Sequence, residues 1–218
     1  NAGTGFRVVN IFTEDHAALT GARDIVIANE LQPEESININ FNLNHWLQRK
    51  DHYTSIDLDL FYTHFSNKIV PNYNTDPTKI IYDNLQGYSI SKGASFQMSH
   101  NFSIPLNISL GGTYLDVYSI NGDKKNIELL TPSFSGVFSI TYEWPLNKIK
   151  LDYTGRIMGP MQLPTYEEEL ARDEISPWYS LQHLKVEKRY TNKISAYLGV
   201  RNLFNFTQES PLVDPGAG

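Results

Sequence analysis

Residues 37–44 read Ile37-Asn38-Ile39-Asn40-Phe41-Asn42-Leu43-Asn44, a strict alternation of apolar and polar side chains. Successive side chains of a β-strand point to opposite faces, so this stretch predicts a strand with one apolar face and one asparagine-rich face. A helix would spread both kinds of side chain around its surface. The stretch therefore favours an all-β fold.

The same period of two returns along most of the chain. It predicts seven further long strands, near residues 55–62, 95–102, 107–114, 134–144, 149–157, 179–186 and 194–203. Two shorter strands are predicted near 6–12 and 23–28. The long segments approach the roughly 9–11 residues that a tilted strand needs to cross a bilayer. Near Gln182-His183 the apolar side chains shift from odd-numbered to even-numbered positions, and this shift predicts a β-bulge.

The connections between these segments alternate in length. Short links fall near 46–53, 102–105, 145–148 and 190–194, and long ones near 13–22, 67–86, 119–131, 158–177 and from 204 onward. This order is typical of outer-membrane barrels, which have tight turns on one side and long loops outside. Aromatic residues accompany the short links and predict an interfacial girdle, at Trp46, Tyr53, Phe102, Tyr142, Trp144 and Tyr190.

Composition excludes several classes of function. The 218 residues carry a net charge of −6, so no nucleic-acid footprint is present and no nucleic-acid partner is expected. Cysteine is absent, which excludes a disulfide framework, a thiolate metal site and a cysteine nucleophile. Mean hydropathy is −0.36, a value that does not separate a soluble β protein from a membrane barrel, because only every second barrel residue must be apolar.

Four stretches, in order along the chain, resemble TonB-dependent receptors, particularly those of Bacteroidetes-type bacteria. They are GTGFRVVNIFTEDHAALTGAR (3–23), ELQPEESIN (30–38), YDNLQGY (82–88) and VRNLFN (200–205). The resemblance implies an all-β, antiparallel up-and-down meander that is the carboxy-terminal part of a 22-stranded transmembrane β-barrel. The family's amino-terminal plug, energy-coupling box and aromatic last strand have no counterpart. We therefore expect residues 1–218 to be one partial barrel, truncated at both ends.

The resemblance also implies a function in active transport. Such a receptor lies in the cell outer membrane and binds a scarce nutrient: an iron chelate such as a siderophore, cobalamin or an oligosaccharide. Its plug then rearranges with energy delivered through TonB. The implied partners are the nutrient ligand, the receptor's own plug domain, the TonB complex and outer-membrane lipid, with no cofactor.

Few residues stand out as candidates for a site. Asp57, Asp59, Asp152 and Arg156 lie on polar faces and are expected to line the lumen near the plug. Lys150 and Arg156 share a face with Asp152, and the spacing of two permits an ion pair. A structural lumen network is the simpler interpretation, and contact with transported ligand is the alternative. Loop segments 13–19 and 166–174 are expected to be a short helix and a helical turn.

No catalytic or metal-binding motif is present. The six histidines are scattered, and neither His-x-x-x-His nor Gly-x-Ser-x-Gly occurs, so no enzymatic activity is expected. Two other functions stay open: a small self-contained outer-membrane barrel acting as adhesin or porin, and a soluble carbohydrate-binding β-sandwich. A closed barrel would shift in gel mobility on heating in detergent, and a sandwich would not.

Overall fold

The structure is a computed structural model that describes residues 1–8, 24–27, 31–72, 79–163 and 173–207. Within these ranges all regular structure is β, and no helix is long and apolar enough to cross a membrane. The strands are β1 (Ala2–Arg7), β2 (Asp24–Ile27), β3 (Glu34–Arg49), β4 (His52–Ser66), β5 (Ile69–Asn72), β6 (Lys79–Asn84), β7 (Gly87–Asn101), β8 (Leu106–Asn121), β9 (Lys124–Ile127), β10 (Phe134–Trp144), β11 (Ile149–Met158), β12 (Tyr179–Arg189) and β13 (Ser195–Val200).

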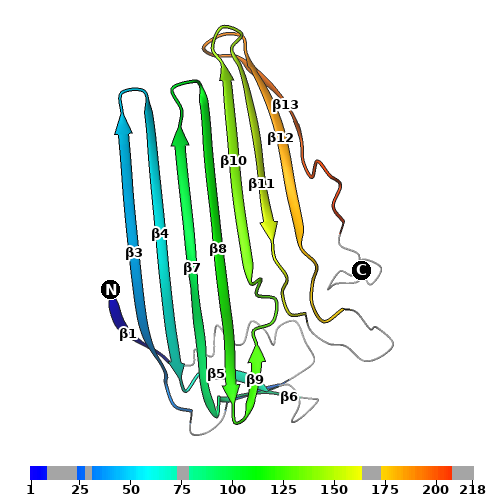
Figure 1. The fold of residues 1–218 in the computed structure, drawn as a ribbon. Helices are drawn as coiled ribbons and strands as arrows, with labels where there is room; N and C mark the ends of the chain where they lie inside the picture. The colour runs from blue at the N-terminus through cyan, green and yellow to red at the C-terminus, as the bar shows by residue number, and fades with distance from the viewer. Residues whose placement is uncertain (9–23, 28–30, 73–78, 164–172, 208–218) are drawn as a thin grey trace. The chain divides into compact units, whose positions relative to one another are not determined.

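The long strands form one sheet in the order of the sequence. Its path runs β1-β3-β4-β7-β8-β10-β11-β12-β13, and β9 pairs with β8 beside it (Figure 1). The registers along this path are antiparallel, as between β10 and β11 and between β11 and β12. Each of the eight long strands predicted from the alternation has a counterpart, although the last, predicted at 194–203, is the six-residue strand β13. The prediction of an all-β antiparallel meander is confirmed.

Short and long connections alternate as predicted. The short ones join β3 to β4, β7 to β8, β10 to β11 and β12 to β13, and longer segments join β4 to β7, β8 to β10 and β11 to β12. The first short link is tighter than predicted. β3 continues to Arg49 and β4 begins at His52, so only Lys50 and Asp51 lie between the strands.

A second sheet joins β2, which the sequence predicted near 23–28, to two strands within the segment 67–86 that was predicted to be a connection. It has the order β2-β6-β5, with β6 antiparallel to β5 and parallel to β2. Ile69 and Tyr82 form its buried core, with Leu31 packed against them. The side chain of Asn84 joins two flanking segments, because it accepts a hydrogen bond from the Gln32 amide (2.7 Å) and donates one to the carbonyl of Asn67 (2.7 Å).

The described chain divides into two compact units. Unit 1 comprises Asn1–Phe41, Leu60–Gly93 and Asp116–Glu128, and contains the second sheet. Unit 2 comprises Asn42–Asp59, Ala94–Leu115 and Leu129–Gly218. The helix predicted at 13–19, and all but the end of the turn predicted at 166–174, lie outside the described residues.

The bulge predicted near Gln182-His183 is wrong. The register between β11 and β12 is unbroken from Ile149↔Lys188 to Met158↔Tyr179. The change of parity in the sequence has another cause: Gln182 is a polar residue on the face that otherwise carries Leu184 and Val186. Its side chain accepts a hydrogen bond from the Tyr153 hydroxyl, so the polar group is satisfied without a bulge.

Candidate functional site

The polar face of β3 and β4 is built from asparagine–aspartate pairs. The Asn42 side-chain amide donates a hydrogen bond to Asp59, and the Asn44 amide donates one to Asp57. Each predicted carboxylate therefore has a donor directly across the strand pair. A carboxylate accepts several hydrogen bonds, so both keep lone pairs for water, a ligand or another protein segment.

A second polar cluster surrounds Asp152 on β11. The Thr141 hydroxyl donates to Asp152 Oδ1 at 2.8 Å, and Lys150 Nζ lies 3.3 Å from the same oxygen. Lys185 Nζ lies 3.8 Å from Asp152 Oδ2 and 3.0 Å from Glu187 Oε2. The cluster thus links three neighbouring strands, β10, β11 and β12.

The ion pair between Lys150 and Asp152 confirms the prediction made from their spacing. Arg156 does not join it in the part of the chain that the structure describes: it lies between Val137 and Leu181 in the strand registers. Lys185 was missed because the apolar positions of its strand appear to shift by one residue near Gln182. Counting from Val186, which the alternation identifies as apolar, would have placed Lys185 on the polar face.

The two clusters share one face of unit 2. Thr54 on β4 contacts His100 on β7, and Ser99 on β7 contacts Ser109 on β8, so the members of each pair lie on the same face of the sheet. The registers from β8 through β10 to β11 then show which residues of β11 lie on the face that carries Ser109. Asp57, Asp59 and Asp152 therefore point to the same side. They do not form a single site, because β7, β8 and β10 lie between β4 and β11. Among the described residues, no group of three His, Asp or Glu side chains is arranged to hold a metal ion.

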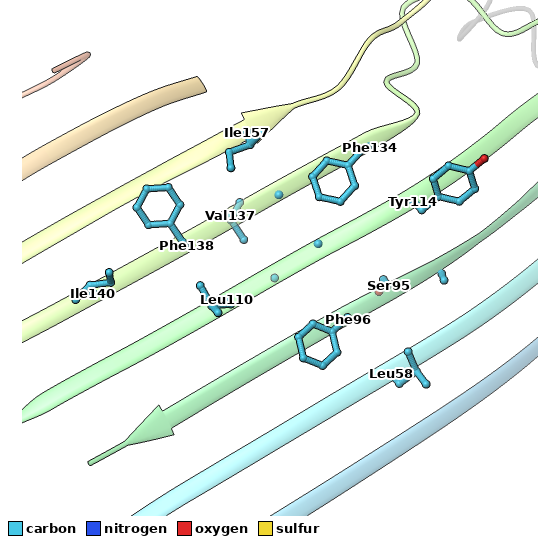
Figure 2. A pocket seen from close by; sticks show the side chains of 14 residues that line it. Leu58, Ser95, Phe96, Leu110, Tyr114, Phe134, Val137, Phe138, Ile140 and Ile157 are labelled. Atoms are coloured by element: carbon cyan, nitrogen blue, oxygen red, sulfur yellow. The ribbon is translucent and has the colours of Figure 1, made fainter. Parts of the chain in front are cut away.

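The opposite face of unit 2 is apolar and carries a hollow of about 540 Å³. Figure 2 shows Phe96, Leu110, Phe134 and Phe138 around it. Gly112 on β8 and Gly136 on β10, which face each other in the register, are among its lining residues, and the ring of Phe134 lies over both. A sheet with one apolar and one polar face, built from strands of 10 to 16 residues along most of its width, has the two surfaces that a membrane barrel requires.

Two residues of the predicted aromatic girdle lie on the wrong face for that role. Trp46 follows Asn44 by two positions in an uninterrupted strand, so it shares the polar face with the asparagines. Tyr53 precedes Asp57 by four positions in the same strand, so it also lies on the polar face. Tyr142 and Trp144, by contrast, lie on the apolar face and make an edge contact with ring centroids 4.5 Å apart.

Known structures share this fold. FpvA, the pyoverdine outer membrane receptor of Pseudomonas aeruginosa PAO1, is 23% identical with a TM-score of 0.64, over 81% of this chain and 26% of that one. The ferric-catecholate import receptor Fiu of E. coli K12 is 17% identical with a TM-score of 0.64, over 81% and 24%. The copper transporter OprC is 15% identical with a TM-score of 0.62, over 93% and 30%. This chain thus spans less than a third of each relative.

A family assignment comes from the sequence itself. No curated protein matches it. The family model described as "TonB dependent receptor-like, beta-barrel" matches residues 1–203, nearly the whole chain. This match argues against the soluble β-sandwich, and it agrees with the two-faced meander of long strands. The chain therefore belongs to the TonB-dependent receptor β-barrel family and is a protein of the outer membrane.

Proposed function

We propose that this chain forms less than half of the wall of a 22-stranded receptor of the Bacteroidetes type, which imports a scarce nutrient with energy delivered through TonB. The observation that carries the proposal is the sheet in which Asp57, Asp59 and Asp152 share one face and the apolar residues cover the other. In a barrel of this family the polar face lines a hydrated interior and the apolar face meets lipid. No catalytic step is assigned to the chain.

The polar face contributes the wall of the passage. Asp57, Asp59, Asp152 and Arg156 line it, and they bind water and the plug domain that occupies the barrel. The hydrogen bonds from Asn42 and Asn44 hold the two carboxylates of β4 in place, and the ion pairs with Lys150 and Lys185 hold Asp152. Side chains held in this way give a plug or a ligand a defined surface.

The transported nutrient is an iron chelate, cobalamin or an oligosaccharide. The structural relatives favour the first, because FpvA is described with pyoverdine bound and Fiu as a ferric-catecholate receptor. Capture falls to the long connections, since loops on a rigid scaffold carry most binding residues. The second sheet stiffens two of these connections through its core of Ile69 and Tyr82.

Uptake measurements test the proposal. The whole receptor is produced in cells that lack their own receptors, and uptake of radiolabelled ferric siderophore, cobalamin and oligosaccharide is measured with and without functional TonB. We expect TonB-dependent uptake of one class. Uptake that persists without TonB would identify a passive porin instead.

Two variants test the role of the polar face. The double change Asp57→Asn and Asp59→Asn is expected to lower the rate of uptake several-fold while the amount of receptor in the membrane stays the same. Val186→Leu, on the apolar face, is the matched control and is expected to leave uptake unchanged. If the double variant takes up the nutrient as fast as Val186→Leu does, the two carboxylates have no role in transport.

A further inference from the structure

Two of the stretches that resemble the receptor family meet in unit 1. Asn84 belongs to the stretch 82–88, and its side chain binds both backbone groups of Gln32, which belongs to the stretch 30–38. The Asn84 side-chain oxygen accepts a hydrogen bond from the Gln32 amide at 2.7 Å, and the Asn84 side-chain amide donates one to the Gln32 carbonyl at 2.9 Å. The same amide group donates to the carbonyl of Asn67 at 2.7 Å. One side chain thus joins three segments that are far apart in the sequence.

Glu34 holds the same small sheet through a second contact. Its side chain is 12% exposed, and its Oε2 accepts a hydrogen bond from the amide of Ile69 at 3.2 Å. Arg7 Nη2 on β1 lies 3.3 Å from the same oxygen. Ile69 is the first residue of β5, and it faces Asn84, the last residue of β6, in the register. Both contacts therefore act on the same end of the second sheet.

These hydrogen bonds join a long connection to the beginning of a long strand. β5 and β6 lie within the connection between β4 and β7, whereas Glu34 is the first residue of β3. The buried core of the second sheet is small, with Ile69 and Tyr82 as its members. Elements with few buried apolar contacts open easily, so the added polar contacts matter for the position of this sheet. Long connections of these barrels face the outside of the cell, where a nutrient arrives.

The second sheet presents one face away from its core. Ile69 and Tyr82 lie on the buried face. Val26 and Ile81 face each other in the parallel register on the other face, and Val26 is 37% exposed. Side chains alternate between the faces along a strand, so the exposed Asp83 lies on this second face too. A fixed orientation of the sheet gives this face a defined position for contact with the nutrient.

We propose that Asn84 and Glu34 are positioning residues for nutrient capture, which hold the second sheet in the orientation that the nutrient binds. This inference rests on the proposed function, in which the long connections capture the nutrient. A ligand that binds one of several orientations loses affinity in proportion to the fraction of receptor that adopts it. If loss of the contacts leaves about a tenth of the receptor in that orientation, the apparent affinity falls about tenfold. The steps after capture depend on the plug and on TonB, so the maximal rate of uptake stays the same.

Asn84→Asp tests the first contact with almost no change of shape. An aspartate still accepts a hydrogen bond from the Gln32 amide, but it cannot donate to the carbonyls of Gln32 and Asn67. Uptake of radiolabelled ferric siderophore, cobalamin and oligosaccharide by the whole receptor is measured over a range of concentrations. For the compound that the wild-type receptor takes up, we expect the half-saturating concentration to rise about tenfold at an unchanged maximal rate. Asn147→Asp makes the same change at the short link between β10 and β11, and this matched control is expected to alter neither value.

Two variants of Glu34 test the second contact. Glu34→Gln keeps an oxygen for the Ile69 amide and loses the charge opposite Arg7, so its half-saturating concentration is expected to stay within about twofold of wild type. Glu34→Ala removes the acceptor as well, and it is expected to match Asn84→Asp. A change in Glu34→Gln as large as in Glu34→Ala would assign the effect to the ion pair and would contradict the role of the hydrogen bond.

Hydrogen exchange measures the position of the second sheet without a ligand. Deuterium uptake by segments 69–72 and 79–84 is followed by mass spectrometry in the purified whole receptor, and we expect it to be faster in Asn84→Asp, with β10 and β11 unchanged. Faster exchange at an unchanged half-saturating concentration, a raised half-saturating concentration without faster exchange, or no change in either would each overturn the positioning role. In these outcomes the wild-type receptor still transports. Failure of the proposed function shows instead as no TonB-dependent uptake by the wild type, which would remove the basis of this inference as well.

Discussion

The ring of Phe138 on β10 covers Gly155 on β11, and a Cβ carried by residue 155 would lie 2.6 Å from two of its carbon atoms. The two residues face each other in the strand register. An aromatic ring laid over a glycine of the neighbouring strand buries backbone that would otherwise be bare, and the pair helps to hold the register.

This contact makes Gly155→Ala a destabilising change. The Phe138 ring must rotate away from its partner strand and from Tyr153, whose ring centroid lies 5.2 Å from its own. We expect the free energy of unfolding to fall by about 1–3 kcal/mol. Urea titration of the receptor in micelles measures it. Gly3→Ala is the control, because no atom lies within 4 Å of the added Cβ, and equal stability of the two variants would contradict the prediction.

A larger loss is expected at Gly87, in unit 1. A Cβ at this position would overlap the backbone carbonyl oxygen of Ile120, and backbone cannot rotate away as a ring can. Gly87→Ala is expected to cost about 3 kcal/mol or more, with part of the β7–β8 pairing lost. The same urea titration measures it, with Gly112→Ala as control. A cost for Gly87→Ala no greater than for the control would show that this close approach is absent.

Breaking the cluster at Asp152 should have a modest, salt-dependent effect. Asp152→Asn removes the attraction of Lys150 and Lys185, whose side chains are 37% and 41% exposed, so we expect a loss of about 1 kcal/mol or less. The loss should shrink in high salt, because screening already weakens the pairs. Asp116→Asn, which breaks the more exposed pair with Lys92, is the comparison and should cost less. An undiminished loss of stability at high salt would assign the effect to the hydrogen bond from Thr141 instead.

Neighbouring residues on opposite faces test the membrane assignment. These 218 residues contain no cysteine, so Asp57→Cys and Leu58→Cys each place a single thiol in this part of the wall. We expect the thiol at 57 to react with a water-soluble maleimide and the thiol at 58 to react only with a membrane-soluble one. Labelling is measured in whole membranes. Reaction of both thiols with the water-soluble reagent would refute the assignment of the apolar face to lipid.

Alternation predicted the long strands because each of them repeats its pattern over many residues. The short strands β5, β6 and β9 were missed, since four to six residues give too few repeats to distinguish a strand from a connection. The tight turn of β9 does carry a local signal. Gly122 has a φ of +58°, in the region that favours glycine, and with Asp123 it forms the two-residue link between β8 and β9.

The candidate site was predictable only within single strands. Spacing of two along β11 was enough for Lys150 and Asp152, which are neighbours on one face. The partners of Asp57 and Asp59 depend on the register between β3 and β4, which periodicity does not contain. Lys185 reaches Asp152 from another strand for the same reason. Residues that share a face follow from the sequence, and residues that meet across strands need the structure.

The parallel pairing of β2 with β6 has a consequence for the order in which this protein assembles. The whole β3–β4 hairpin lies between the two strands in the sequence, so Ile25 and Ile80 become neighbours only after a long loop has closed. Contacts between residues far apart in the chain form slowly, because the entropy of loop closure is lost before the contact is gained. We therefore expect the hairpins of the meander to form early and the small parallel sheet to form late in folding.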